Sequence, residues 1–216
     1  MTADLTTRLV TFPSGSLTLE GVLHLPAETP AAGQPAGLAG VVVCHPHPQH
    51  GGEMRNNVVD AACDALVERG IAALRFNFRG AGRSEGSFDN GRGERDDVRA
   101  ALDFLRAQPE VDDLRIGLCG YSFGAMMAAE VASGELRALA LVSPPLAHGD
   151  LRVAWGCPAL VIGGDSDPVA PEDRLRVVGG QAGVEVRIVE GADHSWWEYE
   201  DELGEALGAF FEAHLK

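Results

Sequence analysis

Residues 120–124 read Gly-Tyr-Ser-Phe-Gly and place one serine, Ser122, between two glycines. A mostly apolar run, 114–119, precedes this segment and small residues, 125–129, follow it, so a strand, a sharp turn and a helix are predicted around the serine. In a nucleophile elbow the serine hydroxyl stands on a strained turn, and the flanking glycines let strand and helix pass closely without side-chain clashes. The pattern predicts Ser122 as a nucleophile.

A serine hydroxyl is a poor nucleophile at neutral pH unless an imidazole takes its proton, and that imidazole needs a carboxylate to fix its tautomer. Among the seven histidines, His194 follows directly after a predicted strand at 184–189. Two aspartates, Asp165 and Asp167, follow the predicted strand at 159–163. Parallel sheets collect functional side chains at the carboxyl ends of their strands, so His194 is the expected base and one of these aspartates the expected acid.

Apolar runs and helical periodicity alternate along the chain, which predicts a mostly parallel sheet of about eight strands with helices on both faces. The sequence shows no internal repeat and no sign of a second domain, and a length of 216 residues suits a single domain, 1–216. The stretch 26–40 is expected to be a surface connection. Strands are predicted at 8–12, 17–25, 40–44, 72–76, 114–119, 137–143, 159–163 and 184–189, and helices at 57–69, 94–107, from 125, at 171–178 and at 196–214.

The formal charge of -15 repels phosphate backbones and anionic lipid surfaces, which disfavours nucleic acid or a membrane as a partner. The first seven residues lack the pattern of a signal peptide and no apolar run approaches about 20 residues, so a soluble, cytoplasmic protein is expected. Four cysteines stand singly without CxxC spacing and are expected to be reduced core residues.

The elbow, the chain order Ser, Asp, His, and the segments 164–168 (Gly-Asp-Ser-Asp-Pro) and 192–194 (Ala-Asp-His) resemble the α/β-hydrolase superfamily. Segments 45–52 and 75–86 resemble a group of small bacterial serine hydrolases related to dienelactone hydrolases. The resemblance implies an α/β-hydrolase fold. Dienelactone hydrolases carry cysteine at the elbow where this chain has Ser122, so their substrate is not transferred.

Within this family the acid stands directly before an apolar-proline segment, which implies Asp167, before Pro168-Val169, as the acid. Asp165 is then expected to bond the backbone of its own loop or to cap the turn. Many relatives carry a lid after the sixth strand. Because only about fifteen residues lie between Ser143 and the strand at Ala159, no cap domain and an open site are expected.

An oxyanion hole needs two backbone N–H groups, commonly from the residue after the nucleophile and from the loop after the third strand. Phe123 supplies the first by position. In His45-Pro46-His47-Pro48 the prolines have no N–H, so His47 is the expected second donor and Gln49 a poorer choice. The rival interpretation takes His45, His47 and His50 as metal ligands, but no matched carboxylate cluster accompanies them.

The segment 79–84 (Arg-Gly-Ala-Gly-Arg-Ser) invites interpretation as a phosphate-binding loop. It lacks the GKS or GKT ending of a P-loop and the strand-loop-helix spacing of a dinucleotide fingerprint. A tight loop bordering the site is the expected structure.

The expected function is hydrolysis of small to medium acyl esters or thioesters, with no metal and no other cofactor. A peptidase or acyltransferase on the same triad, or a non-catalytic binding protein on the same fold, remain alternatives, and the oligomeric state is left open. Apolar side chains considered for the site, each of which could equally be core, are Phe123, Leu146, Trp155, Trp196 and Trp197.

Overall fold

The computed structural model describes residues 6–27, 37–151 and 154–216 as one eight-stranded sheet in the order β1-β2-β4-β3-β5-β6-β7-β8. The first two strands form an antiparallel hairpin that also pairs antiparallel with β4, and the remaining pairings are parallel. This confirms the predicted sheet. Its strands are β1 (Thr6–Ser14), β2 (Leu17–Leu25), β3 (Leu38–Cys44), β4 (Ala72–Phe76), β5 (Val111–Tyr121), β6 (Ala138–Val142), β7 (Ala159–Gly164) and β8 (Val184–Val189).

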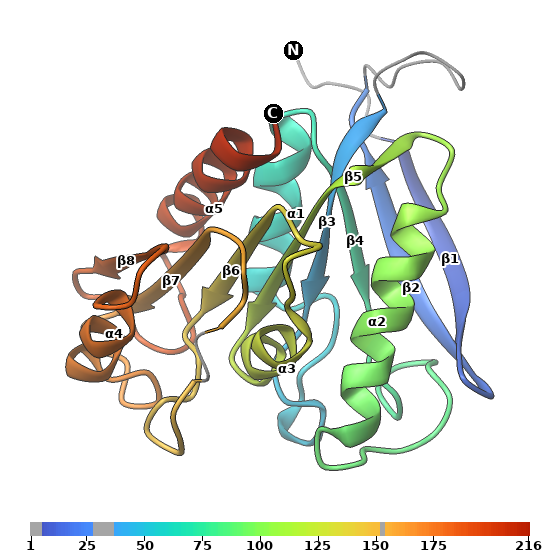
Figure 1. Cartoon of the computed structure of the whole chain (residues 1–216). Helices are drawn as coiled ribbons and strands as arrows, with labels where there is room; N and C mark the ends of the chain where they lie inside the picture. Colours follow the sequence, from blue (N-terminus) through green and yellow to red (C-terminus); the bar gives the residue numbers. More distant parts are fainter. Residues whose placement is uncertain (1–5, 28–36, 152–153) are drawn as a thin grey trace.

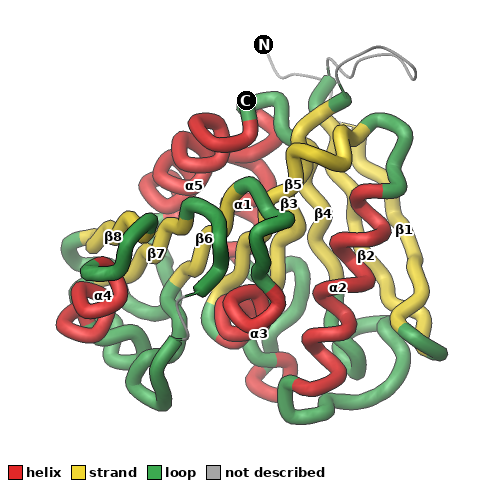
Figure 2. The backbone as a smooth tube through the Cα atoms, viewed as in Figure 1, coloured by secondary structure: helices red, strands yellow, loops and turns green. Residues whose placement is uncertain are grey.

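Helices cover both faces of the sheet, as predicted (Figures 1 and 2). On one face α2 (Arg92–Arg106), α3 (Phe123–Val131) and α4 (Glu172–Gly179) pack over one apolar cluster. On the other, α1 (Asn57–Glu68) and α5 (Glu200–Leu215) pack over a second cluster. The central strands β3, β6 and β7 are buried along their whole length, and β5 is buried from Ile116 to Tyr121, as expected for parallel strands covered on both sides.

The last helix begins at Glu200, so the prediction of a helix from Trp196 was wrong at its start. Trp196 and Glu198 have φ values of 61° and 71°, in the left-handed region that a right-handed helix cannot accommodate. The physical reason is a tertiary one, because the Trp196 side chain is fully buried and donates its indole N–H to Ser143 Oγ at 3.0 Å.

The stretch 26–40 was expected to be a connection, but β3 already begins at Leu38. Residues 28–36 of that stretch lie outside the described residues. The first strand is longer than the predicted 8–12, since β1 extends from Thr6 to Ser14, and the chain reverses at Gly15, which has a φ of 60°. Within the part of the chain that the structure describes, no helix combines the length and apolar composition needed to span a membrane.

The segment 79–84 is held by a buried ion pair. The Arg79 guanidinium donates to both carboxylate oxygens of Asp97 on α2, at 2.7 and 3.0 Å, and the Arg79 backbone N–H donates to the same carboxylate at 3.0 Å. Ser14 adds a fourth donor at 2.7 Å, so the fully buried Asp97 joins the hairpin, the loop and the helix. Because the guanidinium is occupied by this carboxylate, the segment has a structural role in the described fold rather than that of a phosphate cradle.

We expect Asp97→Asn to lower the free energy of unfolding by about 3 kcal/mol, because it leaves the largely buried Arg79 without a charged partner. The neighbouring Asp96 provides the matched control. It pairs with Arg99 at 2.8 Å but exposes 66% of its side chain, so Asp96→Asn should change stability by no more than about 0.5 kcal/mol. Urea denaturation measures both variants, and equal losses would contradict the structural role of the Arg79–Asp97 pair.

Candidate active site

Ser122 stands at the turn between β5 and α3 in a strained backbone conformation. Its φ and ψ are 54° and −116°, and its N–H donates to Val142 O at 2.9 Å. A Cβ atom at Gly120 would fall well inside contact distance of Gly124 O, and one at Gly124 would meet Cys44 O in the same way. The steric role predicted for the two glycines is confirmed, because only hydrogen atoms fit between the strand and helix there.

The structure brings together the three side chains singled out from the sequence. His194 Nε2 lies 3.0 Å from Ser122 Oγ, and His194 Nδ1 lies 2.9 and 3.1 Å from the two oxygens of Asp167. They project from the turns after β5, β7 and β8, which end at one edge of the sheet. With Nδ1–H donating to the carboxylate, the neutral ring presents Nε2 as an acceptor for the serine proton.

Asp167 is buried but well supplied with donors. Its Oδ1 accepts the N–H groups of Val169 at 2.8 Å and Ala170 at 3.1 Å. Burial by itself raises the pKa of the Asp167 carboxyl, but hydrogen bonding and charge from His194, with hydrogen bonds from Ser143 and Ala170, hold that pKa below its ordinary value. The carboxylate is therefore ionised at neutral pH and can stabilise a charged imidazolium.

Two residues lie behind Asp167: Ser143, which was not assigned a site role from the sequence, and Trp196, which was considered only as an apolar side chain near the site. Ser143, directly after β6, hydrogen-bonds the Asp167 carboxylate and accepts the Trp196 indole N–H. Both residues are fully buried, and both have a positive φ, 43° for Ser143 and 61° for Trp196. The placement of Ser143 at the end of a predicted strand was a usable signal, whereas nothing in the sequence links it to Trp196.

Asp165, the alternative acid, faces a different partner. Its Oδ1 accepts the Gly191 N–H at 2.8 Å and the Ser166 hydroxyl at 3.1 Å, and the residue is exposed. Asp165 therefore ties the loop after β7 to the loop after β8. The tie lies two residues before Asp167 in the first loop and, at Gly191, three residues before His194 in the second. This is loop-backbone bonding of the kind expected for the residue that is not the acid.

Tyr121, the residue directly before Ser122, contacts His194 through its hydroxyl group and its ring. Its hydroxyl donates to the His194 backbone oxygen, and the two rings lie 5.5 Å apart. Burial raises the pKa of the Tyr121 hydroxyl above its ordinary value, with further contributions from Asp167 and Asp193, so it stays protonated as a donor. Tyr121 thereby fixes the loop that carries His194.

The backbone around the elbow offers N–H groups suited to an oxyanion. Phe123 is the first residue of α3, and the first N–H groups of a helix have no acceptor inside that helix. In the loop after β3, the Gln49 N–H is donated to His47 Nδ1 at 3.2 Å, which leaves the His47 N–H as the better candidate of the two. His47 lines the same pocket as Ser122 and Phe123.

His45 is a structural histidine. It is fully buried, its Nδ1 donates to Pro46 O at 2.6 Å, and its Nε2 accepts the Phe78 N–H at 3.0 Å. Burial lowers the pKa of His45 to about 4, so the ring is neutral. With both nitrogens engaged, His45 offers no lone pair to a metal ion. Among the described residues no three His, Cys, Asp or Glu side chains form a group able to hold one.

A pocket of about 470 Å³ opens over Ser122 and His194. Of the five apolar residues considered for it, only Phe123 is in its lining. Leu146, Trp155 and Trp196 are buried in the core, and Trp197 is 67% exposed. The residues lining the pocket are Pro46, His47, His50, Gly51, Gly52, Asn56, Tyr121, Ser122, Phe123, Met126, Pro145, His148, Val169 and His194.

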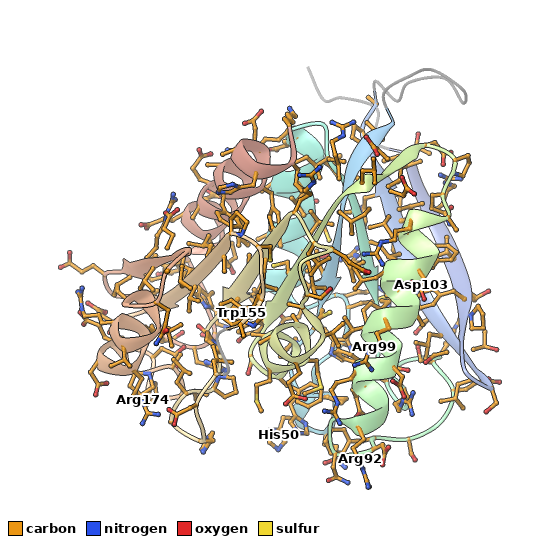
Figure 3. All side chains as sticks on the ribbon, viewed as in Figure 1. His50, Arg92, Arg99, Asp103, Trp155 and Arg174 are labelled. Atoms are coloured by element: carbon orange, nitrogen blue, oxygen red, sulfur yellow. The ribbon has the colours of Figure 1, made fainter. Side chains whose placement is uncertain are left out.

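Two histidines in this lining, His50 and His148, were not placed there from the sequence. The His50 ring stacks on His47 with centroids 4.5 Å apart, and Figure 3 shows His50 at the edge of the sheet where the strands end. No aspartate or glutamate is among the residues that line this described pocket. The pocket therefore presents histidines, other polar groups and apolar groups around the serine, without a carboxylate in its lining.

Comparison with known proteins agrees with this arrangement. A model of the X-Pro dipeptidyl-peptidase family (S15 family) matches residues 23–161. An uncharacterised protein of Rickettsia prowazekii is 33% identical over 183 residues, covering 78% of this chain and 76% of the relative.

Two solved structures share the fold over nearly their whole length. A protein of Coxiella burnetii described as an alpha-beta serine hydrolase homologue is 32% identical, with a TM-score of 0.81 and coverage of 94% of this chain and 96% of the other. A Xanthomonas campestris protein described as an a/b serine hydrolase without lid is 31% identical, with a TM-score of 0.82 and coverage of 97% and 95%.

The fold is that of the α/β hydrolases, and no separate cap domain is present in the described residues. The chain belongs to the X-Pro dipeptidyl-peptidase (S15) family, which the sequence motifs had not indicated. Its similarity to lidless bacterial serine hydrolases confirms the resemblance that the motifs carried. The link to dienelactone hydrolases stays a prediction.

The two aspartates can be separated by substitution. We expect Asp167→Asn to lower kcat by a factor on the order of 10³ to 10⁴, because the amide no longer holds the Nδ1–H tautomer of His194. Asp165→Asn, the matched control, keeps the triad intact and should act mainly on loop stability. Steady-state kinetics and thermal unfolding of both variants check this, and exchanged behaviours would identify Asp165 as the acid.

Proposed function

We propose that this protein hydrolyses carboxylic esters or thioesters with small to medium acyl groups through an acyl-enzyme on Ser122. The observation that carries the proposal is the unbroken hydrogen-bonded line from Ser122 Oγ through His194 to the buried Asp167, at the floor of an open pocket. A non-catalytic binding protein would have no need for a buried carboxylate on the imidazole or for a strained serine at the pocket floor.

In the first step Ser122 Oγ attacks the acyl carbon while His194 Nε2 takes the hydroxyl proton. Asp167 stabilises the imidazolium that forms. The carbonyl oxygen becomes an oxyanion, which the backbone N–H groups of Phe123 and His47 are proposed to bind. When the tetrahedral intermediate collapses, the bond to the alcohol or thiol breaks, and His194 returns the proton to that leaving group.

Water completes the cycle. It approaches the acyl-enzyme from the side that the leaving group has vacated, and His194 Nε2 removes its proton as it attacks. The second tetrahedral intermediate releases the carboxylic acid and restores the Ser122 hydroxyl. An acyltransferase would differ only in the acceptor. No separate cap domain is present in the described residues to keep water from the pocket, which supports hydrolysis.

The family description raises a peptidase as the second candidate. A dipeptidyl-peptidase must recognise the free ammonium group of its substrate close to the scissile bond, and a carboxylate is the side chain that recognises an ammonium most strongly. The described pocket has no aspartate or glutamate in its lining. This supports an uncharged acyl group, and therefore an ester or thioester, over an X-Pro peptide.

The remaining functional expectations follow from the same chemistry. A small molecule is the proposed partner, and the mechanism uses only side chains and backbone of this chain, with no cofactor. Localisation in the cytoplasm, which the first residues indicated, stays a prediction.

We expect Ser122→Ala to fold normally and to lower kcat for p-nitrophenyl acetate at least about 10³-fold, because no covalent step remains. A fluorophosphonate should label the unaltered protein at Ser122, as located by mass spectrometry of the labelled peptide. Full esterase activity in the folded variant would disprove the assignment of the nucleophile. A higher kcat/KM for glycyl-proline p-nitroanilide than for any ester would favour the peptidase.

The oxyanion role of His47 rests on its backbone, which permits a sharp comparison. We expect His47→Ala to keep activity within about tenfold because the N–H survives, and His47→Pro to lower kcat by about 10² to 10³ because it does not. The native φ of −59° suits proline, so the two variants differ chiefly in the donor.

Circular dichroism should show both His47 variants folded. Equal losses of kcat in the two would place the essential group on the imidazole instead. Dialysis against a strong chelator should leave the rate unchanged, and activity lost to the chelator and restored by zinc would support the metal interpretation of this loop.

A further inference from the structure

A second, smaller hollow of about 120 Å³ lies beside the pocket that contains Ser122. Met126 and Pro145 line both, so they form the wall between the two. Because the backbone of Pro145 is rigid and methionine is unbranched with three rotatable bonds, Met126 is the adjustable part of this wall. The second hollow is lined by Met126, Ala129, Glu130, Pro145, Leu146, Gly149, Asp150 and Leu151.

The hollow continues along the face of α3 that begins at the nucleophile. Ser122 is the residue before the helix, and Met126 and Glu130 follow at intervals of four, with Ala129 one position earlier. Residues at this spacing lie above one another on one helix face. A chain attached to Ser122 Oγ can therefore run past Met126 along α3 without crossing the sheet.

The chemistry of the lining selects an aliphatic occupant. The deeper part is made by Met126, Ala129, Leu146 and the ring of Pro145, and Leu146 is only 2% exposed. The far end carries carboxylates instead. Glu130 pairs with Arg95 at 2.9 Å and Asp150 pairs with Arg174, whose position near this edge is labelled in Figure 3. These groups suit an uncharged chain and disfavour one that ends in a second carboxylate.

The position of His194 decides which part of an ester the hollow receives. The leaving alcohol must face His194 Nε2, which returns a proton to it. None of the residues lining the hollow comes from the 190–199 loop that carries His194. The group that extends away from this loop is the acyl chain.

On the basis of the proposed function, we propose that the hollow is an acyl-chain subsite for unbranched, uncharged medium-length chains, and that Met126 sets the chain length admitted. At about 30 Å³ for a group the size of a water molecule, 120 Å³ holds about four such groups. Short acyl chains then fit within the pocket that contains Ser122. Longer chains reach the second hollow only if they displace the Met126 side chain.

Two variants test this in opposite directions. Met126→Ala removes the wall and should raise the ratio of kcat/KM for p-nitrophenyl octanoate to that for the acetate at least tenfold. This follows because each newly buried methylene adds about fourfold, the equivalent of about 0.8 kcal/mol. Ala129→Leu fills the deeper part of the hollow and should lower the same ratio at least tenfold.

Met127→Ala is the matched control. Met127 is the neighbouring methionine, 2% exposed, and lines neither hollow. Its loss should lower thermal stability and leave the chain-length ratio as it is. A ratio that moves equally in the Met126 and Met127 variants would overturn the proposal, as would an unchanged ratio in folded Met126→Ala and Ala129→Leu.

A second substrate series tests whether the acyl part or the alcohol part of the ester occupies the hollow. In this series the acyl group is always acetyl and the alcohol is lengthened. A Met126→Ala effect in this series alone would assign the hollow to the alcohol and disprove the acyl subsite. The proposed function is tested separately by the hydrolysis of p-nitrophenyl acetate, which should be lost in Ser122→Ala. The acyl-subsite proposal can therefore fail while the proposed esterase activity is retained, and the two failures are distinguishable.

Discussion

The buried charge of Asp167 is the interaction on which the organisation of this edge of the sheet depends. A carboxylate that is only 3% exposed is costly unless donors surround it. Here the donors come from His194 after β8, from Ser143 after β6, and from backbone N–H groups of its own loop. Three loops are thereby required to converge on one group. The convergence also places the imidazole against Ser122.

Strain in the backbone is concentrated at the same convergence. Ser122, Ser143 and Trp196 all have positive φ, a conformation that costs energy for any residue with a Cβ and persists only where the surroundings enforce it. Each of the three is held by a hydrogen bond that the conformation makes possible, through the Ser122 N–H, the Ser143 hydroxyl or the Trp196 indole. The close approach of Gly164 to Ala192, where a Cβ would not fit, belongs to the same packing of the loops after β7 and β8.

Much of the fold and of the candidate site was predictable from the sequence, because short-range residue patterns determine the strands, the helices and their order. Strands β2, β4 and β8 lie at their predicted residues, and the order of elements fixes where Ser122, Asp167 and His194 emerge. The choice between Asp165 and Asp167 needed the family pattern as well as position. The roles of Ser143 and Trp196 were not predictable, because a hydrogen bond between residues 53 positions apart leaves no periodicity. The same long-range contact explains why α5 starts at Glu200 and not at Trp196. The presence of His50 and His148 in the pocket lining depends on loop geometry, which residue spacing does not determine.

The distribution of charge bears on which molecules reach the serine. The chain carries a formal charge of -15, yet no carboxylate is among the residues that line the described pocket. Five of its acids line a groove between α1 and α5 instead, namely Asp60, Asp64, Glu68, Glu200 and Glu205. A negative exterior lowers the local concentration of anions, while a pocket without carboxylates offers an ammonium group no partner. Both conditions favour neutral substrates. An oxyanion would then be the one negative charge to develop in the pocket during the reaction. Preorganised backbone N–H groups stabilise such a charge more effectively because the nearest carboxylate of the site, Asp167, lies behind His194 and outside the pocket lining.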